Sequence, residues 1–177
     1  MENRVRIVVY NARQCDPKKC SALKLERHGL VRGVAQVRFL PKRAIVLNPF
    51  SEIAFSPSDR DRIVRFGLAA LDCSWEKAEK FLSTHVKGTS RCLPVLLAGN
   101  PVNFAVPTKL STVEALAGAL FIAGFRDQAS ELLSMFKWGH TFLELNVERL
   151  ESYACAKDSA DVVRMQKVFL ETIGEKT

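Results

Sequence analysis

A change of pattern near Asn100 constrains the fold more than any other feature of the sequence. Before this point, short apolar runs alternate with amphipathic segments, and after it the apolar residues have helical spacing. Strands that alternate with helices are typical of a parallel sheet covered by helices on both faces. The sequence therefore predicts an α/β fold, with a parallel-sheet N-terminal half over residues 1–92 and an all-helical C-terminal half over residues 93–177.

The bounds of the expected elements follow from apolar runs, helix caps and helix breakers. Strands are predicted at residues 5–10, 34–40, 44–49, 68–74 and 94–99. Helices are predicted at residues 16–29, 56–67, 75–85, 112–124, 126–139, 140–156 and 159–174. Helix starts are expected at Ser58 with Asp61, at Ser74 and at Ser111 with Glu114, and helix stops at Gly124 and Gly139.

The stretch from Asn100 to Leu120 joins a stiff loop to a helix of small apolar residues. Pro101 and Pro107 each fix their own backbone and push the preceding residue toward extended conformations. Ser111 and Glu114 have capping-box spacing, so the first helical turn would present unpaired N–H groups and a positive dipole to the region that the loop encloses. An anionic or carboxylate-bearing ligand would suit this position.

In open parallel sheets, ligands bind outside the carboxyl ends of the strands. Two strand exits, at residues 47–49 and 71–75, and the loop after Gly99 are predicted to share one such crevice. Asp72 ends an apolar strand, where a carboxylate favours contact with a ligand amine or a structural donor over a role as a helix charge. The indole of Trp75 could pack against a purine or a sulfonium, and a role in core packing alone is equally consistent with the sequence.

Several classes of site are not favoured. The five cysteines are scattered and odd in number, which argues against a disulfide framework. Cys15 and Cys20 have only His28 near them in sequence, too few ligands for a zinc site, and no metal is predicted. No catalytic triad, GxGxxG or GxxxxGK[ST] pattern is present. The segment at residues 137–146 is more typical of core and helix-corner packing than of a cofactor site.

The net charge of +7 is unevenly divided. Residues 1–92 carry 18 Lys and Arg against 9 Asp and Glu, whereas residues 93–177 carry 8 against 10. This asymmetry fits a nucleic-acid partner and a solvated basic surface equally well. The start of the chain lacks a signal-peptide pattern and no segment reaches the length of a membrane span, so a cytoplasmic protein without membrane contact is expected.

Seven ordered motifs resemble those of the small-subunit ribosomal RNA aminocarboxypropyltransferases in their short archaeal form. They are DPKKCSALKL, AIVLNPFSE, SPSD, GLAALDCSW, RCLPVLLAGNPVNF, KLSTVEALAGALFIAGF and FKWGHTFLELN. The resemblance extends to about Tyr153. DPKKC also occurs in a ribosome-recycling ATPase of the ABC type, but the missing P-loop excludes that protein.

This resemblance implies a SPOUT-like fold with a deep trefoil knot, in a protein that acts as a monomer. It also implies a cofactor, S-adenosylmethionine, whose 3-amino-3-carboxypropyl group is transferred to N3 of N1-methylpseudouridine in small-subunit rRNA, with methylthioadenosine as the leaving product. Two alternatives remain open. One is an rRNA methyltransferase of the same knotted class, and the other is a non-catalytic, basic ribosome-assembly factor.

The family's binding residues can be carried over by position. Ser21 and the amide of Thr112 would hold the methionyl carboxylate, and the carbonyl of Leu71 would accept from the ribose. The adenine would be read by the amide of Leu93 and the carbonyl of Thr108. Apolar walls are expected from Leu47, Pro49, Trp75, Leu110 and Ala115. Among the expected catalytic residues, Trp75 would also cover the methyl group, and Asp72 would act as a polar contact or as a base.

Basic residues of the first half would neutralise phosphates of the rRNA or of a pre-ribosomal particle. They are Arg13, Lys18, Lys19, Lys24, Arg27, Arg38, Lys42 and Arg43. The sequence departs from the family pattern at three places. NPVNFA stands where the family commonly has Asn-Pro-Val-Asn-Tyr-Gly, Thr108 stands where an aromatic residue is common, and Ser21 replaces a threonine.

Overall fold

The computed structural model describes residues 4–12, 16, 20–73 and 88–174. The helix expected at residues 75–85 and its cap Ser74 lie outside the described residues, as does Trp75.

Five strands form one parallel sheet in the order β2-β1-β4-β3-β5. The strands are β1 (Ile7–Asn11), β2 (Arg32–Val34), β3 (Ile45–Leu47), β4 (Leu68–Asp72) and β5 (Thr89–Arg91). Asn11 pairs with Asp72 at the carboxyl ends of β1 and β4, and Leu47 pairs with Arg91 at the ends of β3 and β5. The predicted parallel sheet is therefore confirmed, and its strand ends lie together at one edge.

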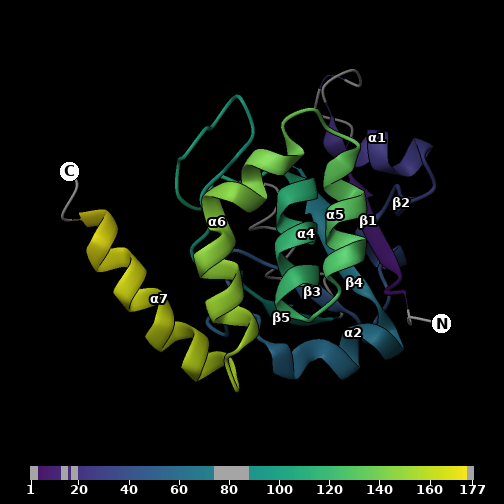
Figure 1. Cartoon of the computed structure of the whole chain (residues 1–177). Helices are drawn as coiled ribbons and strands as arrows, with labels where there is room; N and C mark the ends of the chain where they lie inside the picture. Colours follow the sequence, from purple (N-terminus) through teal and green to yellow (C-terminus); the bar gives the residue numbers. More distant parts are fainter. Residues whose placement is uncertain (1–3, 13–15, 17–19, 74–87, 175–177) are drawn as a thin grey trace.

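Helices follow the strands and then continue alone through the second half (Figure 1). The α-helices are α1 (Ser21–Arg27), α2 (Arg60–Phe66), α4 (Thr112–Ile122), α5 (Arg126–Ser134), α6 (Gly139–Ala154) and α7 (Ser159–Gly174), with 3-10 turns η1 (Val37–Phe39) and η2 (Pro57–Asp59). In Figure 1, α4 lies between α5 and α6, and α7 extends away toward the C-terminus. The predicted change to helices only is confirmed.

The sheet is buried on both faces, as expected of parallel strands with apolar runs. On β1, Ile7 and Val9 join the larger core cluster, whereas Val8 and Tyr10 join a smaller cluster on the opposite face. The larger cluster includes six of the eleven residues of α4, among them Leu116, which is fully buried, and two more pack against it. This explains why the sequence of α4 is apolar along most of its length rather than on one stripe.

Two predicted strands are wrong. The segment at residues 34–40 contains the end of β2 and then the 3-10 turn η1, in which only Val37 is buried. The segment at residues 94–99 is not a strand of the sheet, and its place at the edge is taken by β5. Leu97 forms only an isolated bridge with Pro107.

Two predicted helix ends also differ from the structure. The capping box of the second predicted helix is formed by Ser56 and Asp59, two residues before the expected Ser58 and Asp61. Asp59 also pairs with Arg91 at 3.0 Å, which ties this helix start to β5.

Gly139 begins α6 instead of ending α5, and a Cβ atom there would lie 2.0 Å from the carbonyl oxygen of Leu133. Gly124, with φ of 83°, does follow the end of α4.

None of the helices within the described parts of the chain combines the length and the apolar character needed to cross a membrane.

Candidate functional site

A cavity of about 650 Å³ opens at the carboxyl ends of β3 and β4, between the starts of α1 and α4. This volume is within the range typical of small-molecule sites. Its lining is Cys20, Ser21, Leu47, Asn48, Pro49, Ala70, Leu71, Asp72, Cys73, Cys92, Leu93, Pro94, Thr108, Leu110, Ser111, Thr112 and Ala115. The cavity therefore lies where the strand exits and the loop after Gly99 were expected to meet.

The structure brings the predicted cofactor-binding residues together around this one cavity. All of those within the described residues line it, and they are Ser21, Leu47, Pro49, Leu71, Asp72, Leu93, Thr108, Leu110, Thr112 and Ala115. Trp75, the other predicted residue, lies outside the described residues. The first and last of these positions, Ser21 and Ala115, are 94 residues apart in the sequence, so the fold brings them together.

Asp72 is held by donors from two helices. The hydroxyl of Thr112 donates to one carboxylate oxygen at 3.0 Å, and the thiol of Cys20 donates to the other at 3.0 Å. The carbonyl of Asp72 accepts from the amide of Ala12. The cost of placing a carboxylate at the end of an apolar strand is thus offset by hydrogen bonds, which was one of the two favoured readings of this residue.

Cys20 is a site residue that sequence reasoning did not identify. Its sulfur caps α1 by accepting from the amide of Leu23 at 3.4 Å, while its proton points to Asp72. Burial raises the pKa of the Cys20 thiol, and the adjacent Asp72 carboxylate raises it further. Cysteine is not among the preferred helix caps, so cap rules did not favour this residue over its serine neighbour.

The N-terminus of α4 faces the cavity with Ser111, Thr112 and Ala115. The predicted capping box of Ser111 and Glu114 is confirmed. Glu114 is fully buried and accepts hydrogen bonds from the amides of Gly99 at 2.6 Å and Asn100 at 3.0 Å as well as from Ser111. The positive end of this helix, with its backbone donors, is suited to a carboxylate in the cavity.

The opposite wall of the cavity is mostly main chain and apolar side chains. Leu93 and Pro94 enter it after β5, and Thr108 and Leu110 return to it from the loop. Thr108 has φ of 64°, which is rare for a β-branched residue, and its amide donates to the carbonyl of Leu96 at 2.9 Å. Backbone polar groups between apolar side chains suit the edge and the faces of a flat heterocycle.

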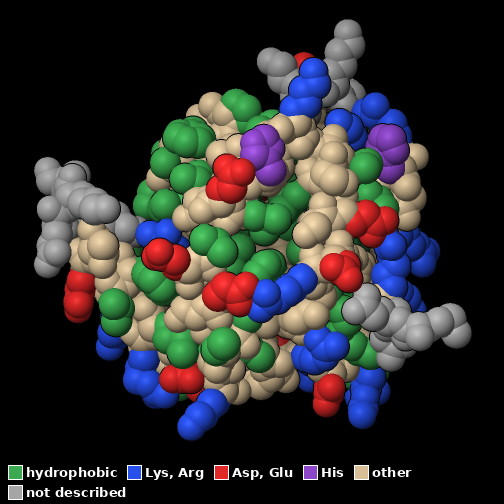
Figure 2. All heavy atoms as spheres, viewed as in Figure 1, with side chains coloured by type: hydrophobic (Ala, Val, Ile, Leu, Met, Phe, Trp, Pro, Cys, Tyr) green, Lys and Arg blue, Asp and Glu red, His purple; other side chains and the backbone are tan. Residues whose placement is uncertain are grey.

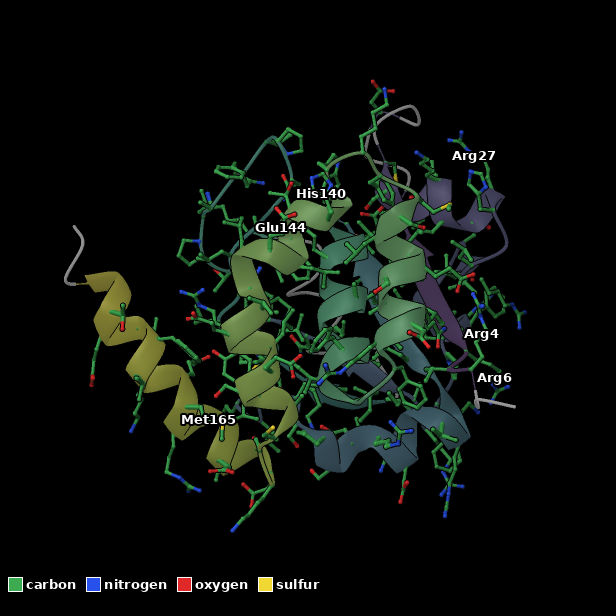
Figure 3. All side chains as sticks on the ribbon, viewed as in Figure 1. Arg4, Arg6, Arg27, His140, Glu144 and Met165 are labelled. Carbon is green, nitrogen blue, oxygen red and sulfur yellow. The ribbon has the colours of Figure 1, made fainter. Side chains whose placement is uncertain are left out.

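The described residues predicted to bind RNA are spread over the N-terminal half. Arg27 ends α1, Arg38 lies in η1, and Arg43 precedes the amino end of β3, with its guanidinium 4.2 Å from the centre of the Phe66 ring. Figure 2 shows Lys and Arg side chains gathered at the right of the view, beside α1 and β2, and Figure 3 shows Arg27 pointing outward there. Arg27, Arg38, Lys42 and Arg43 are exposed. Arg13, Lys18 and Lys19 lie outside the described residues.

Lys24 is the one described member of this set that is half-buried. Its amine donates to the carbonyl of Met135 and lies 4.8 Å from the centre of the Phe136 ring. An RNA phosphate would have to share this amine with the protein.

Within the described residues, no three His, Cys, Asp or Glu side chains come together as a metal site would require.

Two protein families match parts of the chain. Residues 45–170 match the family described as "Ribosome biogenesis protein, C-terminal". Residues 5–35 match a family described as "Possible Fer4-like domain in RNase L inhibitor, RLI". This second segment contains Cys15 and Cys20 as its cysteines, whereas an iron–sulfur cluster is held by four cysteine ligands.

Named relatives cover nearly the whole chain. A 16S rRNA aminocarboxypropyltransferase of Methanothermobacter thermautotrophicus is 51% identical over 94% of this chain and 99% of its own length. One from Methanopyrus kandleri is 51% identical over 93% of this chain and 98% of its own length. The solved structure of the SAM-dependent rRNA:acp-transferase Tsr3 from Vulcanisaeta distributa is 36% identical, with a TM-score of 0.83 over 95% of this chain and 97% of that chain. The chain therefore belongs to the family of 16S rRNA aminocarboxypropyltransferases.

Proposed function

We propose that this protein transfers the 3-amino-3-carboxypropyl group of S-adenosylmethionine to N3 of N1-methylpseudouridine in small-subunit rRNA during ribosome biogenesis. The observation that carries the proposal is the cavity of about 650 Å³, whose lining includes every described residue expected to bind the cofactor. The relatives named as aminocarboxypropyltransferases support the reaction class. The neighbouring structure, named as SAM-dependent, supports the cofactor.

The residues in the cavity fit the parts of S-adenosylmethionine. Ser21 and the N-terminus of α4 at Thr112 would hold the carboxylate, because both supply donors and the helix supplies a positive dipole. The carbonyl of Leu71 would accept from the ribose hydroxyls. The amide of Leu93 and the carbonyl of Thr108 would bind the adenine edge. Apolar walls would come from Leu47, Pro49, Leu110, Ala115 and Trp75.

Each carbon that is bonded to the sulfonium sulfur of S-adenosylmethionine carries a good leaving group. The main task of the protein is therefore to select which carbon is exposed and to orient it. Trp75 would cover the methyl group. In the transfer, N3 forms a bond to the terminal carbon of the aminocarboxypropyl chain while the bond from that carbon to sulfur breaks and its electrons remain on sulfur. Methylthioadenosine then leaves.

Asp72 would contact the amino group of the transferred chain and would be placed to accept the proton from N3. Its two oxygens already accept from Thr112 and Cys20, which fixes the plane of the carboxylate toward the cavity. A carboxylate in a fixed orientation contributes to a reaction by positioning and by stabilising nearby positive charge.

The RNA would bind through the exposed residues Arg27, Arg38, Lys42 and Arg43, with further contacts from Arg13, Lys18 and Lys19. Phosphate contacts of this kind position a nucleic acid, while stacking and shape select the nucleotide. The target base would reach the cavity by leaving its stack, because N3 of a stacked base is not accessible to a pocket.

The proposal extends to a SPOUT-like fold with a deep trefoil knot, in a monomer that acts in the cytoplasm. Residues 95–99 pack closely against helices that follow them in sequence. A Cβ atom at Gly99 would lie 2.5 Å from the backbone nitrogen of Phe142 in α6, and a Cβ atom at Gly118 in α4 would lie 2.9 Å from Leu96. The segment thus passes closely between two helices that follow it in sequence.

The mass of the modified nucleoside tests this function. The purified protein and S-adenosylmethionine are incubated with a small-subunit rRNA fragment carrying N1-methylpseudouridine, and a fragment with unmodified uridine at that position is the control. A gain of an aminocarboxypropyl group on the first fragment alone is expected. A gain of a methyl group would make the protein a methyltransferase. RNA that is bound but unchanged in mass would instead favour a non-catalytic ribosome-assembly factor.

A further inference from the structure

The segment at residues 95–99 forms hydrogen bonds on both sides. On one side its partners are side chains of helices, and on the other side its partner is the backbone of the loop that leads to Thr108. The amide of Ala98 donates to the carbonyl of Val106 at 3.1 Å, and the amide of Thr108 donates to the carbonyl of Leu96 at 2.9 Å. In Figure 1 this loop projects beside the start of α6. The even-numbered residues therefore hold the loop that returns to the cavity.

The odd-numbered residues bond to side chains from three helices of the second half. The amide of Val95 donates to Gln166 at 2.8 Å, and its carbonyl accepts from Tyr153 at 3.1 Å. The amide and the carbonyl of Leu97 each bond to Asn146 at 2.8 Å. The amide of Gly99 donates to Glu114 at 2.6 Å. These side chains take the place of a neighbouring strand, because buried backbone groups need partners.

Three of these partners are fully buried, and they are Glu114, Asn146 and Tyr153. Burying polar side chains costs free energy unless every group is bonded, so each of them is committed to the contacts it makes. Burial also raises the pKa of Tyr153 to about 12, which keeps its hydroxyl as a donor to Val95. The loop that ends at Thr108 therefore depends on a set of contacts that lies behind the cavity and does not line it.

We propose that Asn146, supported by Glu114 and Tyr153, is a positioning residue for cofactor binding. It acts through the main chain at Leu97, whose neighbour Leu96 fixes the amide of Thr108. This inference rests on the proposed function, in which Leu93 and Thr108 hold the adenine. It also gives a role to the motif at residues 137–146, of which Asn146 is the last residue.

The chain contains a matched control for Asn146. Gln128 on α5 makes the same pair of contacts with the backbone of Val5, accepting from its amide at 3.0 Å and donating to its carbonyl at 2.8 Å. Gln128 is also buried and lies outside the cavity lining. Asn146→Asp and Gln128→Glu each replace an amide by a carboxylate of the same shape. Gln128→Glu loses the donor to the carbonyl of Val5. Asn146→Asp loses the donors to the carbonyl of Leu97 and to that of Phe142 within α6, both at 2.8 Å.

Binding of S-adenosylmethionine and of methylthioadenosine to the two variants is measured by calorimetry, together with their unfolding midpoints. Both variants are expected to unfold at lower temperature than the wild type. Asn146→Asp should weaken binding of both ligands by about tenfold, because the loop that ends at Thr108, where the adenine would bind, shifts. Gln128→Glu should bind both as the wild type does. Ser21→Ala should weaken S-adenosylmethionine only, because methylthioadenosine lacks the carboxylate.

The outcomes separate the inference from the function on which it rests. If the wild type binds neither ligand, the proposed function fails. If the wild type binds both and Asn146→Asp binds them as tightly as Gln128→Glu does, the positioning role of Asn146 is refuted.

A milder variant covers the case in which Asn146→Asp does not fold. Tyr153→Phe removes one donor to Val95 and keeps the aromatic packing against Phe169. It should weaken both ligands by about threefold. Unchanged affinity in a folded Tyr153→Phe would then contradict the inference.

Discussion

The hydroxyl of Thr112 donates a hydrogen bond of 3.0 Å to the carboxylate of Asp72, across forty residues of sequence. The contact joins the carboxyl end of β4 to the first turn of α4, so it fixes two of the elements that line the cavity relative to each other. The thiol of Cys20 completes the arrangement from the start of α1. Three segments thus determine where the Asp72 carboxylate points.

Replacing Thr112 by valine should lower the turnover number by about tenfold with little change in affinity for S-adenosylmethionine. Valine keeps the shape of the side chain and the backbone amide but leaves Asp72 without one donor. Single-turnover rates and calorimetry measure the two effects. Thr172→Val is the control, since Thr172 donates to Val168 on the surface of α7. Equal turnover in Thr112→Val and wild type would contradict the role of this contact.

The buried thiol of Cys20 predicts an alkaline limit to stability. Burial and then Asp72 raise its pKa above the ordinary value near 9, so the folded state holds the proton more strongly than the unfolded state. The stabilisation is complete below the ordinary pKa and is lost as pH rises through the raised pKa of the folded state. Relative to Cys20→Ser, the wild-type free energy of unfolding should therefore fall as pH rises above about 9.

Denaturant titrations of the two proteins from neutral to alkaline pH measure this difference. Serine keeps a donor for Asp72 and an acceptor for the amide of Leu23, so the comparison isolates the ionisation of the thiol. A difference that stays constant with pH would show that Cys20 does not ionise as proposed.

Ala105 should be a position where glycine stabilises the protein. Its φ is 59°, and an L-residue in this region costs roughly 1–2 kcal/mol that glycine avoids. Glycine loses part of this gain through the entropy of the unfolded chain, which leaves about 0.5–1 kcal/mol in favour of Ala105→Gly. Ala123→Gly is the control, since Ala123 has φ of −78° and should lose stability. A lower thermal midpoint for Ala105→Gly would contradict this account.

Much of the sheet and the helical half follows from the sequence because the signals are local. Apolar runs locate β1, β3 and β4, and the spacing of Ser111 and Glu114 locates the start of α4. The segment at residues 94–99 has the same apolar character as these strands. Its partners are Gln166, Tyr153, Asn146 and Glu114, which no local pattern could have indicated.

The residues that line the cavity could be predicted from the resemblance to the family, whereas the contacts that hold these residues in place could not. Cys20 is adjacent to the expected Ser21, but its contact with Asp72 depends on how α1 meets β4. The exact start of the helix predicted at residues 56–67, which begins with η2, was missed for a different reason. Ser56 and Ser58 are both good helix caps, and the choice between them is made by Asp59, which also pairs with Arg91.

RNA binding should weaken with salt, and the exposed basic residues should account for part of the dependence. Each phosphate contact contributes about 0.7–0.9 to the slope of log affinity against log salt concentration. The double variant Arg38→Ala, Lys42→Ala should therefore reduce the slope by about 1.5. Arg164→Ala, Lys167→Ala on α7 removes the same charge from the other half and should leave the slope unchanged. Filter binding at several salt concentrations measures both, and equal slopes would argue against the assigned surface.

Transfer of the aminocarboxypropyl group is tested most directly by two labels in S-adenosylmethionine, tritium in the methyl group and carbon-14 in the carboxyl group. The protein is incubated with small-subunit rRNA that lacks its own modification. The account predicts carbon-14 in the RNA and tritium released in methylthioadenosine. Tritium in the RNA without carbon-14 would contradict it.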